Sequence, residues 1–169
     1  MDEIVNKVKQ SGLKTLDLAQ FIPQESVVVF DLKDYLWQEL ILKEKDFRAA
    51  LKDFDWMSLE GKAVAIICSA DAIVPTWAFM LVASYLQKNN IKHIVGSPDE
   101  MSKQLIKAKI EEINPKDYTD ARIIVKGCAD IAVPNFAMTY LVTYLQNEVK
   151  SLMYGEPCST VPIYKAPKK

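Results

Sequence analysis

Apolar residues recur along the chain in short continuous runs that alternate with longer stretches of helical spacing. The run Ser26 to Leu32 is rich in β-branched and aromatic residues, which is typical of a buried strand. Residues 44–54 place apolar side chains three and four positions apart with charges between them, which predicts an amphipathic helix. Residues 63–68 are apolar at every position, as in a strand covered on both faces.

The same alternation continues through the second half of the chain. Ser97 to Glu100 has the sequence of a capping box and predicts the start of a helix that runs to about residue 113. The other expected elements are strands at 91–95, 122–126 and 149–154, a helix at 134–147 and a loop at 155–162. This order predicts an α/β fold with a mainly parallel sheet, because helical crossovers join parallel neighbours.

One unit of strand, loop and helix occurs twice, at residues 63–87 and 122–146. A shift of 59 positions lays residues 70–87 on 129–146, and 8 of the 18 residues coincide. A repeat constrains the architecture before any single residue is interpreted. We therefore expect the two loops at the same end of one sheet, with helices on both faces of that sheet.

The N-terminal region has a weaker pattern. Ile4, Val5 and Val8 have helical spacing and predict a short helix, whereas residues 13–22 favour no single element. Residues 34–42 are expected to form the second strand of an N-terminal hairpin at the sheet edge, with a helical turn as the alternative. The length of 169 residues predicts a single α/β domain over residues 1–169.

Composition narrows the functional classes. The chain has 21 basic and 22 acidic residues and a formal net charge of −1, so no basic face for nucleic acid is expected. The first residues lack the plan of a signal peptide, and no apolar run reaches the roughly 18 residues that a membrane span needs. A cytoplasmic protein is the resulting expectation.

Three cysteines are the main candidates for chemistry. An odd number in a chain expected in the cytoplasm favours free thiols or metal ligands over a disulfide framework. Thiolates and neighbouring carboxylates can hold zinc, and three thiolates can hold an iron–sulfur cluster. The candidate ligands, all expected in loops or at strand ends, are Cys68, Cys128, Cys158, Asp71, Asp130 and Glu156.

Each candidate has a simpler alternative. Free cysteines are among the most buried residue types, so three ordinary packed thiols are the more common arrangement. Cysteine catalysis lacks a nearby base, because the single histidine, His93, falls inside an expected strand. Asp71 and Asp130 keep the same register in the repeat, and each is expected to cap the helix that follows it, with acid–base or metal chemistry as the alternative.

Four segments together resemble a known bacterial family. They are residues 41–48, 68–78, 126–130 and 153–162, including Cys68-Ser-Ala-Asp and Gly155-Glu-Pro-Cys-Ser-Thr. On these segments the chain resembles the family called domain of unknown function 2480 over nearly its whole length. The resemblance implies a stand-alone cytoplasmic bacterial protein with no assigned activity, and a protein partner in iron–sulfur cluster assembly. The order of elements from residue 26 to 95 is also similar to STAS-type binding and regulatory domains.

Three classes of function remain open from the sequence. The first is an accessory protein with a cysteine-based metal or iron–sulfur site at the strand-end loops. The second is a non-catalytic binding module that forms a homodimer, because Trp37, Leu40 and Ile41 crowd apolar side chains into a segment with no evident burial. The third is an enzyme that acts on a small molecule at the strand-end cleft.

Overall fold

The structure, a computed structural model, describes residues 13–127 and 130–167. It has a mixed α/β fold and divides into two compact units. Unit 1 comprises Met1–Pro23 and Leu105–Lys169, and unit 2 comprises Gln24–Gln104. Unit 2 is thus inserted in the sequence of unit 1. The expectation that the whole chain acts as one domain stays a prediction.

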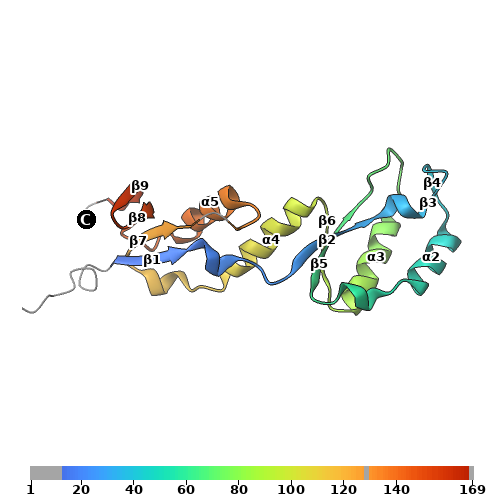
Figure 1. Cartoon of the computed structure of the whole chain (residues 1–169), viewed down its shortest axis with the longest axis horizontal. Helices are drawn as coiled ribbons and strands as arrows, with labels where there is room; N and C mark the ends of the chain where they lie inside the picture. The colour runs from blue at the N-terminus through green and yellow to red at the C-terminus, as the bar shows by residue number, and fades with distance from the viewer. Residues whose placement is uncertain (1–12, 128–129, 168–169) are drawn as a thin grey trace, which may run out of the picture. The chain divides into compact units, whose positions relative to one another are not determined.

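Unit 1 contains a four-stranded sheet in the order β1-β7-β8-β9. Its elements are β1 (Leu13–Asp17), the 3-10 helix η1 (Leu18–Phe21), the C-terminal part of α4 (Pro98–Glu111), the 3-10 helix η4 (Pro115–Tyr118), β7 (Arg122–Lys126), α5 (Pro134–Leu145), β8 (Ser151–Glu156) and β9 (Ser159–Lys165). The first three strands are parallel, and β9 pairs antiparallel with β8 (Figure 1). The second half of this unit therefore ends in a hairpin.

Unit 2 contains a three-stranded parallel sheet in the order β2-β5-β6. Its elements are β2 (Ser26–Asp31), the 3-10 helix η2 (Leu32–Tyr35), β3 (Leu36–Trp37), β4 (Ile41–Leu42), α2 (Glu44–Asp53), the 3-10 helix η3 (Trp56–Leu59), β5 (Lys62–Ile67), α3 (Thr76–Lys88) and β6 (Lys92–Val95). Strands β3 and β4 pair only with each other. Figure 1 shows α3 beside the three strands and α2 on the far side of α3.

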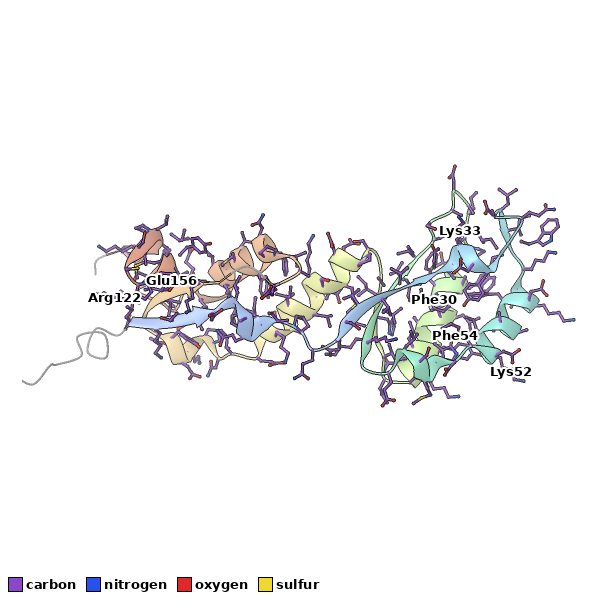
Figure 2. All side chains as sticks on the ribbon, in the orientation of Figure 1. Phe30, Lys33, Lys52, Phe54, Arg122 and Glu156 are labelled. Carbon is purple, nitrogen blue, oxygen red and sulfur yellow. The ribbon has the colours of Figure 1, made fainter. Side chains whose placement is uncertain are left out.

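Alternate residues of the strands pack against the helices in the core of each unit. In unit 2, Phe30, Val64 and Ile66 pack with buried residues of α2 and α3. Phe30 lies in this core and the partly buried Phe54 packs against it, and both are labelled in Figure 2. In unit 1, the corresponding strand residues pack with α4 and α5. The expected helices on both faces are not confirmed, since in each unit the two helices share one core with one set of alternate strand residues.

The two sheets have matching registers. In unit 2 the central strand pairs Ala63 with Lys92 of β6, and in unit 1 it pairs Arg122 with Ser151 of β8. Every residue of the second pair lies 59 positions after its counterpart in the first, and the same holds at the other paired positions of these strands. Thus β6 and β8 occupy corresponding places in their sheets.

Most expected helices and strands are observed within two residues of their expected bounds. The prediction that both repeat loops follow strands of one sheet is wrong, because β5 and β7 belong to different sheets. Residues 155–162, expected as a loop, instead contain the end of β8 and the start of β9. The short helix expected around Ile4 to Val8 lies outside the described residues.

The favoured hairpin between residues 26–32 and 34–42 is also wrong. Strand β2 pairs in parallel with β5, and the chain turns at once into η2. The cause is local, because the Asp31 carboxylate accepts a hydrogen bond from the Lys33 N–H and Leu32 is fully buried. An aspartate that caps a turn in this way competes with continued extended structure.

Candidate functional site

The structure describes two of the three predicted cysteine ligands. Cys68 follows β5 in unit 2, where it is half-buried and its Sγ lies 3.7 Å from the carbonyl oxygen of Ala70. Cys158 is exposed in the turn between β8 and β9 of unit 1, beside the exposed Glu156. Cys128 lies outside the described residues. The described part of the chain has no group of three or more metal-binding side chains, so the zinc or iron–sulfur site stays a prediction.

Asp71 and Asp130 do not cap the helices that follow them. Helix α3 begins after Pro75 and α5 begins after Val133, and neither of these cap residues makes a side-chain hydrogen bond. The capping prediction is therefore wrong for both aspartates. Both aspartates lie too far before the helices to act as caps, because the cap positions are occupied by Pro75 and Val133. In α5, Pro134 at the first helical position also has no N–H that needs a cap.

The two aspartates instead line separate hollows. In unit 2, Asp71 lines a groove of about 430 Å³ together with apolar residues of the β3–β4 hairpin, such as Leu40, and of its own loop between β5 and α3, such as Ile73. In unit 1, Asp130 lines a small pocket of about 170 Å³ that also contains Asp17. Each exposed carboxylate thus faces solvent near the end of a parallel strand.

Asp31 is a strand-end carboxylate that the sequence analysis missed. Its oxygens accept hydrogen bonds from the N–H of Lys33 at 2.9 Å, the N–H of Ser69 at 3.0 Å and the Oγ of Ser69 at 2.5 Å. Partial burial alone would raise the pKa of Asp31, but these hydrogen bonds and the nearby Lys33 charge lower it. The carboxylate ties the end of β2 to the loop after β5.

Asp17 occupies the corresponding place at the end of β1 in unit 1. Its carboxylate accepts a hydrogen bond from the N–H of Ala19 at 3.0 Å and lies 3.7 Å from the Nζ of Lys126. Gly127 has a φ of +80°, and a Cβ there would lie 2.7 Å from Asp17 Oδ1. The sequence signal for both carboxylates was an Asp-Leu pair that closes a strand, at residues 17–18 and 31–32.

A cavity with an apolar lining lies within unit 1. It has a volume of about 480 Å³ and is bounded by β7, β8, β9 and the first turns of α5. Its lining residues are Val125, Pro134, Asn135, Met138, Thr139, Val142, Leu152, Tyr154 and Ile163. The cavity therefore lies towards the carboxyl ends of the parallel strands, which is the usual place for ligands in open α/β sheets.

Titratable groups with shifted pKa values lie elsewhere. The Tyr140 hydroxyl donates a hydrogen bond of 2.5 Å to Glu111, and this bond raises the pKa of Tyr140 to about 12. The other described groups with a resolved shift are Asp31, Tyr35 and Glu100. None of the four lines the cavity of unit 1, so its lining favours apolar contact over acid–base chemistry.

A family model described as "Protein of unknown function (DUF2480)" matches residues 2–166. The chain belongs to this family. The resemblance found from the sequence segments is thereby confirmed, and it covers nearly the whole chain. No curated protein and no solved structure matches the chain.

Membership of the DUF2480 family assigns no activity, so the residues themselves must carry the functional argument. In the described part of this DUF2480 chain, no helix has the length and apolar character needed to cross a membrane. The features that remain are the apolar cavity of unit 1, the strand-end carboxylates and several exposed apolar side chains.

Proposed function

We propose that this protein is a non-catalytic binding module that holds a small, largely apolar ligand in the cavity of unit 1. The observation that carries the proposal is the cavity of about 480 Å³ between α5 and strands β7, β8 and β9. Ligand pockets typically have volumes of roughly 300–1,000 Å³ and combine an apolar lining with a few polar groups. Here the polar side chains are Asn135 and Thr139, on the first turns of α5.

The chemistry of the lining supports an apolar ligand. Val125 and Leu152 come from adjacent parallel strands, and Met138 and Val142 lie on one side of α5. The Thr139 hydroxyl already donates to the carbonyl of Asn135 at 2.9 Å, so it offers mainly its lone pairs to a ligand. An alkyl chain or hydrocarbon ring with one hydrogen-bond donor matches this arrangement.

We further propose that the two units are copies of one ancestral binding unit. The fully buried residues of α3 are Ala78, Val82 and Leu86, and those of α5 are Ala137, Leu141 and Leu145. Each lies 59 positions after its counterpart, as do the 3-10 helices η3 and η4 and the β6 and β8 registers. The repeat predicted from residues 63–87 and 122–146 would then extend over most of both units.

The ligand proposal is tested by calorimetric titration of the full chain with 1-octanol and with octanoate. We expect saturable binding of 1-octanol with a negative heat-capacity change, because apolar surface leaves water. Val142→Trp should abolish the binding by filling the cavity. Ligand at 100 times its Kd should also stabilise the wild-type fold by about 2.7 kcal/mol.

Thr143→Trp is the matched control, because Thr143 is an exposed neighbour on α5 that does not line the cavity. This variant should bind 1-octanol as the wild type does. Circular dichroism and thermal melting establish that both tryptophan variants are folded. No saturable heat with either probe, or equal binding by a folded Val142→Trp variant, contradicts the proposal.

A further inference from the structure

Strand β6 is the outer strand of the unit 2 sheet and carries exposed apolar surface. The sheet order is β2-β5-β6, and Val95 at the end of β6 is 60% exposed. Met80 on α3 is 67% exposed. The residues 59 positions after these two, Thr139 and Tyr154, line a single cavity in unit 1. The matching registers thus indicate that Met80 and Val95 belong to one surface beside the β6 edge.

Strand β8 of unit 1 corresponds to β6, and its pairing indicates which kind of strand could pair with the outer edge of β6. Strand β8 pairs with its central strand in the register of β6, and its outer edge is covered by the antiparallel strand β9. β9 contributes Ile163 to the cavity that α5 and β8 line. An antiparallel strand beside β6 would place a residue opposite Val95, as β9 places Val161 opposite Tyr154. Outer strands that expose backbone and apolar side chains are ready templates for pairing with another chain.

We propose that two copies of this chain associate through β6. A strand that pairs with its own copy across a two-fold axis is necessarily antiparallel, which is the sense of the β8–β9 pairing. The two three-stranded sheets would then form one sheet of six strands, and Val95 and Met80 of each copy would be covered by the other. Such a contact is isologous, because each residue meets the same surface on the partner.

The charges on either side of β6 fit a second copy. Lys88 and Lys92 lie at or before the start of the strand, and Asp99 and Glu100 lie just after its end. Antiparallel pairing brings the basic start of one strand towards the acidic end of the other. Lys92 already pairs with Glu25 at 2.6 Å, and Glu100 accepts hydrogen bonds from Ser97.

Lys88 and Asp99 are exposed charges that precede and follow the strand, and we expect them to meet across the two-fold axis. Their contribution should be modest in affinity and larger in selecting the antiparallel register, as for other charges at the rim of an interface. Complementary charge is the feature that distinguishes a second copy from a generic apolar peptide.

Sedimentation velocity of the full chain over a concentration series tests the proposal. We expect a monomer–dimer equilibrium in the wild type and at least a tenfold higher dimer Kd in Val95→Lys, because a lysine at an outer strand opposes pairing. Val161→Lys is the control, since Val161 is 58% exposed on the outer strand of the other sheet. It should leave the dimer Kd unchanged.

Charge exchange tests the geometry separately. Lys88→Glu and Asp99→Lys should each weaken the dimer severalfold, and the double variant should recover the wild-type Kd. Thermal melting checks that every variant is folded. A wild type that stays monomeric at its solubility limit overturns the proposal. It is equally overturned if Val161→Lys disrupts the dimer while Val95→Lys does not, or if the double charge variant shows no recovery.

Discussion

The three parallel strands of unit 1 have the same arrangement and register as the three strands of unit 2, but the two units fill their cores with different side chains. The core of unit 2 is built around a connected aromatic cluster, in which Trp56 stacks on Phe30 and on Tyr85 with centroid distances of 5.7 and 5.1 Å. The core of unit 1 is mainly aliphatic. At positions 59 apart, for example, Phe47 of unit 2 is replaced by Ile106 of unit 1.

The different core side chains accompany a cavity that is described in unit 1. Phe79 packs against the core of unit 2, and its counterpart Met138 lines the cavity of unit 1. The strands that follow the central strand also differ between the units. Strand β8 is paired with β9 on its outer side, whereas β6 is the outer strand of its sheet. One backbone plan can therefore supply a ligand cavity in one unit and a pairing edge in the other, as we propose.

The largest effect is expected from removal of the aromatic centre of unit 2. Trp56 is 7% exposed, and its Nε1–H donates to the carbonyl of Leu51 at 2.8 Å. Trp56→Ala should destabilise the protein by about 3–5 kcal/mol through cavity formation, measured by urea unfolding. The counterpart in unit 1 is Pro115, and Pro115→Ala should cost under about 1 kcal/mol. Comparable losses in the two variants would contradict the difference between the cores.

Helices and central strands were predictable because their signals are local. The capping box, for example, is observed with a 2.7 Å hydrogen bond from the Ser97 N–H to Glu100, and this bond lowers the pKa of Glu100. The buried strand at residues 63–68 corresponds to β5, in which Ala63 to Ile66 are fully buried. Side-chain periodicity and capping are encoded within a few residues.

Pairing between distant strands was not predictable from the same signals. Strand β1 pairs with β7, more than a hundred residues later, and nothing in residues 13–17 indicates this partner. The pattern also could not show that the similar segments 63–87 and 122–146 contribute to separate sheets, because each segment contains a complete strand, loop and helix in either arrangement. Strand β9 was missed because Pro162 interrupts its pattern, and proline is tolerated only at outer strands or irregularities.

The sequence predicted that the candidate site lies at strand ends, but it did not predict which residues form it. The metal-site prediction included Cys68 and Asp71, whereas the described hydrogen bonds at that edge of unit 2 join Asp31 and Ser69. A cavity depends on which side chains fail to fill a space between elements, and that volume is not a property of any short segment. The cavity of unit 1 therefore required the structure.

A smaller difference in stability is expected between substitutions of the two strand-end carboxylates. Asp31 accepts three hydrogen bonds from Lys33 and Ser69, whereas Asp17 accepts one from the N–H of Ala19 in the described residues. Asp31→Asn should therefore cost about 1–2 kcal/mol at neutral pH, and Asp17→Asn about 1 kcal/mol or less. Urea unfolding of both variants measures the difference.

The pH dependence sharpens this prediction. Because the folded-state pKa of Asp31 lies below its unfolded value, the ionised carboxylate stabilises the fold above the unfolded pKa. That contribution falls as the pH drops through the folded pKa. The gap between wild type and Asp31→Asn should thus be constant near neutral pH and shrink below about pH 4. A gap that widens on acidification would contradict the assigned role of the carboxylate.

The smallest effect on stability is expected at a turn where the two units have different residues in the left-handed backbone region. Gly61 has a φ of +71° before β5, and Asp120, 59 positions later, has a φ of +56° before β7. A Cβ at Gly61 would meet no atom within 4 Å, so only backbone strain opposes substitution. Gly61→Ala should therefore cost about 1 kcal/mol, and Gly61→Asp should cost less, because aspartate tolerates the left-handed region better than alanine. Thermal unfolding of the two variants measures this order. A larger cost for Gly61→Asp than for Gly61→Ala would show that the two turns are not equivalent.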